Sequence, residues 1–363
     1  MDTSTFGIRL SISGYPPISC RAGDWLASPR SHQVVARSAL LTLTGRGNVP
    51  GATARMPPGG RAHGGRVTDF LQLAIQGIAL GAVYALIALG FVIVYKATQV
   101  INFAQGELVL LGAYLVYAFN QTALPFAASV ALAVVVMAAL GWAIERTILR
   151  RMVGKPVFAV VMITIGLAIV IRQIVAAVWG FDDLLLGEPW AAARVQVGGL
   201  GINVTSIVTI ATAGALLVLF LIFFRFTRAG IGMRATAIDQ EAALAVGIPV
   251  RGVFAQAWMI AGAIAAIAGV LLVAFPATLH PAVGFTALRA FPAAIVGGLD
   301  STGGAVIGGI LVGLVEVLVQ GYQPQLAPWL GNNFHVAAAY LLMIVVLVVR
   351  PYGLFGTRVV ERV

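Results

Sequence analysis

The sequence predicts an all-α protein, a polytopic bundle of transmembrane helices. Hydrophobic residues make up 60% of its 363 positions and charged residues only 10%, and the mean hydropathy is +0.97. These values lie well outside the range of soluble domains. The apolar residues form continuous runs, many about as long as the roughly 20 residues that carry a helix across a bilayer. Because the runs show no strict alternation, they also exclude a transmembrane β-barrel.

Residues 1–66 differ from everything after them. They contain eight arginines and many Gly, Pro and Ser residues, but no apolar run long enough for a membrane span or a signal-peptide core. We interpret this stretch as a disordered extension or as a product of start-site assignment, with Met56 as the alternative start. The membrane domain is then expected over residues 67–363.

Eight membrane segments are expected from Phe70 onward, each a largely apolar run bounded by charged or turn-forming residues. The seventh is long and rich in glycine, and we expect it to be a broken pair. The segments cover approximately residues 71–95, 104–120, 124–144, 157–179, 204–224, 252–275, 286–320 and 335–349.

Arginines and lysines in the short loops indicate the orientation, because they are retained on the cytoplasmic side. Two loops hold most of them, Arg146, Arg150, Arg151 and Lys155 in one and Arg225, Arg228, Arg234 and Arg251 in the other. Residues 180–202 carry three acidic residues against the single Arg194, as expected for the outer face.

The basic C-terminus also belongs inside, which requires residues 286–320 to leave the outer face and return to it. We therefore expect a re-entrant or broken helical hairpin that turns within residues 297–304. For the side of the membrane on which the N-terminal tail lies, two alternatives remain. Three full crossings before Arg146 would place the arginine-rich tail outside, so either residues 104–120 are re-entrant or the tail breaks the rule.

Small residues recur at four-residue spacing in two segments. Gly77, Gly81 and Ala85 do so in the first, and the hairpin holds the pairs Gly304 with Gly308 and Gly309 with Gly313. In lipid, such residues let helix backbones approach closely. We interpret them as helix contacts and not as ligand-binding positions.

Polar residues inside the apolar runs are candidates for lining a pathway, because a charge at mid-bilayer costs at least about 2.5–3.5 kcal/mol on insertion scales and usually faces a bundle interior or a cavity. Asn102, Gln105 and Glu107 interrupt one run: they either line a pathway or form a turn in which Asn102 caps the next helix. Glu316 lies deep in another, and an ion pair with Arg289 or Arg172 is favoured over proton transfer. Arg172 itself is expected to snorkel outwards.

The stretch RATAIDQEAALAVGIPV, residues 234–250, is too polar for a membrane span. On a helical period Met233, Ala237, Leu244 and Ile248 form one narrow stripe, with the charges off it. We expect one short amphipathic helix at about residues 230–248 on the cytoplasmic face, ended by Gly247 and Pro249. It either rests on membrane lipid or docks into a groove of a soluble partner.

No catalytic motif, phosphate-binding loop or metal-ligand spacing is present in the sequence. The single cysteine and four scattered histidines suit no metal site. Despite a net charge of +10, the arginines are too dispersed to suggest nucleic acid as a partner. We expect no enzyme activity in this chain.

From Phe70 to the C-terminus the sequence resembles the LivH-type permeases of branched-chain amino acid ABC transporters. The resemblance rests on six motifs in unbroken order, GAVYALIALGFVIVY, INFAQGELVLLGAY, IERTILRR, RATAIDQEAALAVGI, AGAIAAIAGVLL and FPAAIVGGLDSTGGAVIGGILVGLVE. Where the family often shows histidine, this chain has Gln105. We take that difference as a permitted variation.

This resemblance implies a subunit of a bacterial inner-membrane importer for branched-chain or related amino acids. Its expected partners are two ATPase subunits, which would bind the ATP, a second homologous (LivM-like) permease and an extracytoplasmic substrate-binding protein. No cofactor is expected on this chain itself. The residues that match the family's ATPase-coupling pattern are Arg234, Ala235, Asp239, Ala242, Ala243 and Gly247.

Two other classes of function remain open at this point. An ion-coupled secondary transporter would use Glu107 or Glu316 for proton coupling. A passive channel for small polar solutes would need neither a proton gradient nor an ATPase. The polar segment at residues 234–250 argues against both, because neither needs a docking surface.

Overall fold

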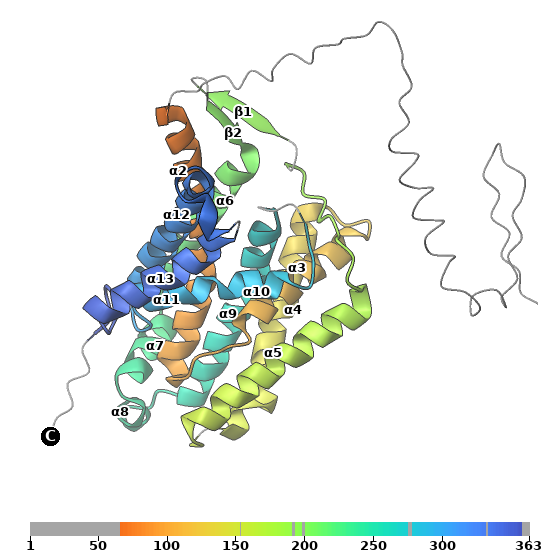
Figure 1. Cartoon of the computed structure of the whole chain (residues 1–363). Coiled ribbons are helices and arrows are strands. Elements are labelled where there is room, and N and C mark those ends of the chain that lie inside the picture. Colours follow the sequence, from red (N-terminus) through yellow and green to blue (C-terminus); the bar gives the residue numbers. More distant parts are fainter. Residues whose placement is uncertain are drawn as a thin grey trace, which may run out of the picture. The chain divides into compact units, whose positions relative to one another are not determined.

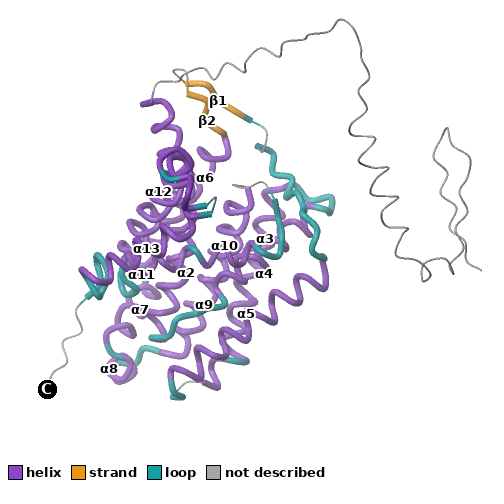
Figure 2. Tube along the Cα trace, viewed as in Figure 1, coloured by secondary structure: helices purple, strands orange, loops and turns teal. Residues whose placement is uncertain are grey.

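The computed structural model describes residues 66–152, 154–190, 193–197, 200–274, 278–331 and 333–357. The extension expected at residues 1–66, including Met56, lies outside this part apart from its last residue. Within the described part the chain is almost wholly helical, with one two-stranded hairpin (Figure 2).

The described elements follow the order in which the sequence predicts them. They are α2 (Arg66–Thr98), α3 (Gln105–Asn120), α4 (Phe126–Thr147), the 3-10 helix η2 (Leu149–Met152), α5 (Val157–Trp179), β1 (Arg194–Val197), β2 (Leu200–Asn203), α6 (Val204–Phe226), α7 (Arg228–Ile238), α8 (Gln240–Ala245), α9 (Val250–Ala274), α10 (Val283–Leu288), α11 (Ala290–Gly297), α12 (Thr302–Leu326), η3 (Pro328–Leu330) and α13 (Phe334–Val349).

Six of these helices are long and apolar enough to cross a membrane, namely α2, α4, α5, α6, α9 and α12. Shorter apolar helices cover residues 283–297 and 334–349. Each of the eight expected segments therefore corresponds to a helix or helix pair, and the predicted polytopic helical bundle is confirmed. The hairpin β1–β2, with Arg194 opposite Asn203, has no counterpart in the sequence-based expectations.

Helix α2 lies at the centre of the bundle, because 94% of its most apolar stretch is buried. It packs most extensively against α12. Glycines make this approach possible. A Cβ atom added to Gly81 would lie 2.6 Å from the Ile310 Cα, and one added to Gly309 would lie 2.5 Å from the Ala85 Cα. The spaced glycines therefore pack helices, as the sequence predicts.

The predicted broken hairpin is present as α10, α11 and α12. A tight turn at residues 298–301 joins α11 to α12, and the Ser301 hydroxyl caps α12 by accepting from the Gly304 N–H at 3.0 Å. The chain after α13 folds back onto this turn, where the Leu354 and Phe355 N–H groups donate to the Val296 and Gly297 carbonyls. The C-terminal residues and the hairpin turn thus lie at one end of the bundle.

Helix α3 begins inside the bundle. After α2 ends at Thr98, residues 99–104 reverse the chain direction and bring Gln105 back beside α2. The two are so close that a Cβ atom on Gly90 would collide with the Gln105 side chain. From there α3 runs to Asn120, whose amide donates to the Leu186 carbonyl at 3.0 Å in the loop that precedes β1. Residues 104–120 therefore end at the face opposite the 99–104 turn. The re-entrant alternative is wrong, and α2 begins beside β2 (Figure 1).

Candidate functional site

The polar segment at residues 234–250 is not one helix, as expected, but parts of α7 and α8, which lie at the end of the bundle away from β1–β2 (Figure 1). Asp239 separates them because its backbone is extended, with φ −155° and ψ 116°. Its carboxylate accepts from the Glu241 and Ala242 N–H groups at 2.8 and 3.0 Å and so caps α8. Gly247 ends the segment with φ +86°.

The break at Asp239 changes which side chains face outwards. Met233 and Ala243 are buried, but Leu244, expected in the same stripe as Met233, is 58% exposed. The single stripe is wrong because the helical register does not continue through an extended residue. An apolar surface results, which we call the α7–α8 surface and which consists of Ile238, Leu244 and Val246, exposed by 87%, 58% and 76%.

The other residues expected in coupling support these two helices. Arg234 donates to the Arg225 carbonyl at 3.1 Å and lies over the Phe224 ring, which fixes α7 to the end of α6. Ala235 is half-buried and Ala242 is exposed. The expected coupling residues thus gather on α7, α8 and the turn after α8.

The start of α3 holds the first polar group inside the bundle. Asn102, Gln105 and Glu107 are all fully buried. The side-chain oxygen of Asn102 accepts a hydrogen bond from the Ala104 N–H at 3.0 Å. Its side-chain NH2 donates a hydrogen bond to the side-chain oxygen of Gln105 at 3.4 Å. Asn102 therefore orders the start of α3, as one of the two alternatives predicts, although Ala104 is the residue at the N-cap.

Glu107 forms an ion pair with Arg172 of α5. The snorkelling expected for Arg172 is wrong, because its guanidinium turns inwards to this carboxylate and lies over the Phe285 ring, 3.6 Å from the ring centre. Gly284 of α10 packs against the same carboxylate, where a Cβ atom would collide. Helices α3, α5 and α10 meet at this pair.

Glu316 has two partners. Arg289, at the junction of α10 and α11, donates to one carboxylate oxygen at 3.1 Å, and the Tyr84 hydroxyl of α2 donates to the other at 2.8 Å. The ion pair with Arg289 is one of the two expected from the sequence. The sequence does not predict Tyr84 as a partner of Glu316, because no local spacing points to it.

The two ion pairs converge on α10, which packs against α3. The carboxylates are buried, but the Arg172 and Arg289 side chains are 22% and 29% exposed and Phe285 is 56% exposed. Phe285 and Arg289 are four residues apart and so share one side of a helical turn. We call Arg172, Phe285 and Arg289 the α10 face. Its sequence signal is the i, i+4 pair of an aromatic and a cationic residue inside an apolar region.

Among the described residues, no group of three or more His, Cys, Asp or Glu side chains lies close enough to hold a metal ion. The arrangement offers a pair of partly exposed guanidiniums beside an aromatic ring, within a bundle of membrane-sized helices, and a separate apolar surface at one end.

The family model described as the permease component of branched-chain amino acid transport systems matches residues 73–349. LivH of Escherichia coli (strain K12), a high-affinity branched-chain amino acid transport system permease protein, is 34% identical over 81% of this chain and 98% of its own length. BraD of Pseudomonas aeruginosa is 29% identical over 82% and 99%, and a probable LivH of Methanocaldococcus jannaschii is 28% identical over 78% and 92%.

Proposed function

Because the chain belongs to the family of branched-chain amino acid transport system permease components, we propose that it forms the membrane pathway of an ATP-driven importer for branched-chain amino acids. The observation that carries this proposal is the family match over residues 73–349, which covers every membrane-sized helix of the described chain except the start of α2. The importer is expected in a bacterial inner membrane. Its other parts are two ATPase subunits, a LivM-like second permease and an extracytoplasmic binding protein.

The α7–α8 surface is the proposed docking site for an ATPase subunit. Exposed Ile238, Leu244 and Val246 form an apolar patch on two short helices, in a region whose arginines indicate the cytoplasmic side. A helix pair of this size fits a groove on a soluble partner. Since α7 and α8 connect α6 with α9, movement of the docked pair would shift the cytoplasmic ends of both spans.

Charge reversal at Asp239 tests this docking site. Asp239→Arg removes the cap of α8 and places a cation beside the apolar patch, so we expect ATP-dependent uptake and stimulated ATP hydrolysis to fall by about tenfold, the effect of losing one strong interface contact. Uptake into proteoliposomes and phosphate release from the purified complex measure both quantities.

Two control variants make the docking test specific. Asp239→Asn keeps an oxygen that can cap α8 and is expected to retain most activity. Asp182→Arg makes the same charge reversal in the exposed loop at the other end of the bundle and is expected to have no effect. Normal uptake by Asp239→Arg, with the complex inserted, would remove the docking assignment.

The α10 face is the proposed wall of the translocation pathway. Arg172 is well inside α5, and Arg289 contacts Tyr84 and Glu316, which both lie near the middle of their long helices. Exposing guanidiniums to hydrocarbon at such depth is costly, so this face must border a water-filled path or the second permease. The substrate carboxylate would pass the guanidiniums while its aliphatic chain contacts Phe285.

In this proposal the four polar residues expected to line the pathway do not contact the substrate. They support the residues that do. Glu107 and Glu316 hold the two guanidiniums in place, and neither is a free proton carrier, because each is already paired with an arginine. Gln105 and Asn102 order the start of α3, which carries Glu107. This arrangement favours a pathway that binds a carboxylate over one that relays protons.

Truncating the exposed aromatic ring tests the pathway. Phe285→Ala removes the contact with the Arg172 guanidinium and the proposed contact with the substrate side chain, while the buried carboxylates keep their partners. We expect uptake to fall by about tenfold, in line with a lost cation–π and apolar contact of about 1–2 kcal/mol. The matched control is Phe181→Ala, since Phe181 is 67% exposed in the loop after α5. Equal uptake by both variants would refute the role of Phe285.

The energy source separates this function from its two rivals. With the complete complex in proteoliposomes, uptake should require internal ATP and should continue when an uncoupler collapses the proton gradient. Uptake that survives without ATP but stops with the uncoupler would indicate a secondary transporter. Uptake independent of both would indicate a channel.

A further inference from the structure

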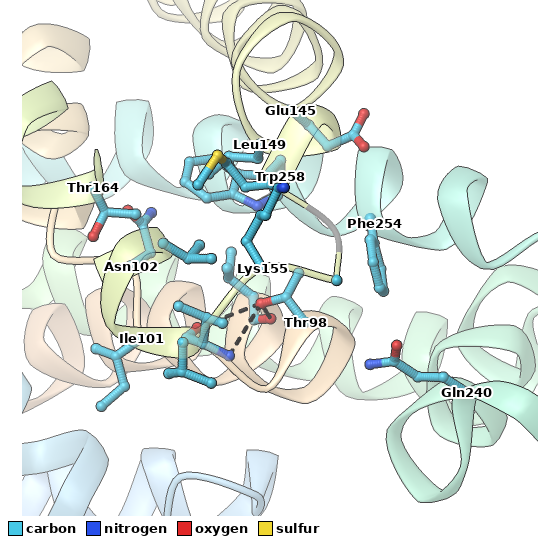
Figure 3. Close-up of a pocket in the computed structure, with 16 residues that line it drawn as sticks. Thr98, Ile101, Asn102, Glu145, Leu149, Lys155, Thr164, Gln240, Phe254 and Trp258 are labelled. Atoms are coloured by element: carbon cyan, nitrogen blue, oxygen red, sulfur yellow. Dashed lines mark hydrogen bonds between the residues drawn. The ribbon is translucent and has the colours of Figure 1, made fainter. Parts of the chain in front are cut away.

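A cavity of about 140 Å³ is lined by Gln240 of α8 and by none of the three residues of the α10 face. Figure 3 shows the residues that line it. Six regions of the chain form its wall: the end of α2 and the turn after it, the end of α4 with η2, the loop that holds Gly154 and Lys155, the start of α5, α8, and α9. The lining residues used below are Trp258, Lys155, Glu145, Gln240, Phe254 and Leu149.

Two polar groups of this cavity, the buried Trp258 indole and the exposed Lys155 ammonium, are hydrogen-bond donors without a protein partner among the described residues. Trp258 is only 1% exposed, and its indole Nε1 has no hydrogen-bond partner within the described part of the chain. Leaving such an N–H buried and unpaired is costly. Figure 3 shows the Lys155 side chain extending towards this indole, and no ion pair involving Lys155 is formed among the described residues.

Glu145, the one acidic residue of the wall, does not offset these donors. Both of its carboxylate oxygens accept from Arg150, at 3.3 and 3.0 Å. The rest of the wall is mostly aliphatic or aromatic, including Leu149 and Phe254. The cavity therefore suits a small molecule that has one anionic group and an apolar body.

We propose that this cavity binds a small aliphatic carboxylate from the cytoplasm, with the carboxylate accepting from Trp258 Nε1 and Lys155 Nζ. The chemical class of the ligand follows from the proposed function, on which this assignment rests: a branched-chain amino acid, or the 2-oxo acid formed from it. Both share a carboxylate beside a branched aliphatic chain.

The position of the cavity implies that a bound ligand would slow transport. Gln240 of α8 lines it opposite the loop between α4 and α5. A ligand there would bridge the proposed docking helices and that loop, and so restrain the movement that ATP hydrolysis must produce. Accumulated product on the cytoplasmic side would then slow further import.

The test is equilibrium binding to the purified complex without the binding protein, using tritiated leucine and, as competitors, 4-methyl-2-oxopentanoate and 3-methylbutylamine. Trp258→Phe removes the N–H and keeps an aromatic ring, and Lys155→Met removes the ammonium. Each is expected to weaken binding by about tenfold, as for a lost hydrogen bond to a charged group. The carboxylates should compete and the amine, which lacks a carboxylate, should not.

Matched controls come from the same region. Arg151→Met removes a charge from the same loop and Trp142→Phe an indole from α4, and neither residue lines the cavity. Both should bind as the unaltered complex does. Absence of leucine binding, binding unchanged in Trp258→Phe and Lys155→Met, or equal competition by the amine would each overturn the proposal. Because binding is measured without transport, a failed uptake assay would count against the proposed function alone.

Discussion

Gly81→Leu is expected to abolish the folded bundle or lower its melting temperature by many degrees. Even the first side-chain carbon would lie 2.6 Å from the Ile310 Cα and 2.9 Å from the Gly309 carbonyl oxygen, and both atoms belong to the backbone. Backbone cannot rotate away as a side chain can, so α2 and α12 would have to separate. Overpacking of this kind typically costs about 1–3 kcal/mol and more where nothing yields.

The measurement is thermal unfolding in detergent, followed by size-exclusion chromatography of the fluorescently tagged protein. Gly166→Leu in α5 is the matched control, because the space around its Cβ position is open within 4 Å. That variant should be as stable as the parent or slightly more stable, since leucine favours a helix over glycine. A Gly81→Leu variant that unfolds at the same temperature as Gly166→Leu would contradict the observed α2–α12 contact.

Glu316→Leu is expected to be the most damaging single change at the candidate site. It leaves the Arg289 guanidinium and the Tyr84 hydroxyl without their acceptor, and removing one partner of a buried ion pair costs about 3–5 kcal/mol. We expect a large loss of folded protein and no measurable uptake. Thermal unfolding and uptake are both needed, because they separate stability from transport.

A triple variant distinguishes the two effects. Tyr84→Phe, Arg289→Leu and Glu316→Leu together remove every member of the network, so no unpaired charge remains inside. Replacing a complete buried pair with apolar residues is often neutral or stabilising, so the melting temperature should recover. Uptake should stay absent, because Arg289 is part of the proposed pathway. Recovery of uptake in the triple variant would show that Arg289 acts only in stability.

The sequence is sufficient to predict the parts of this fold that depend on local composition. The eight membrane segments follow from the lengths of the apolar runs, and the hairpin turn at residues 298–301 follows from the distribution of arginines. The glycine spacing of Gly77, Gly81 and Ala85 predicts close helix contacts, although not that α12 is the partner. Each of these signals lies within one short stretch of chain.

Other features depend on pairings that no local pattern encodes. Arg172 turns inwards because Glu107, 65 positions away, is buried beside it. From α5 alone the same arginine is equally suited to snorkelling. Asp239 illustrates a different failure, because its preference for capping overrides the helical period on both sides of it. The single expected helix is therefore divided, and the outward-facing residues change.

The enclosure of α2 has a consequence for the order in which the protein is assembled in the cell. This helix is made first among the described elements, yet α12, its most extensive neighbour, is synthesised about two hundred residues later. Until then α6 and α9 can cover other parts of α2, but the face that carries Gly77 and Gly81 lacks its partner. Biogenesis thus includes a late docking step, and truncated chains that stop before α12 should persist as inserted but incomplete bundles open to membrane proteases.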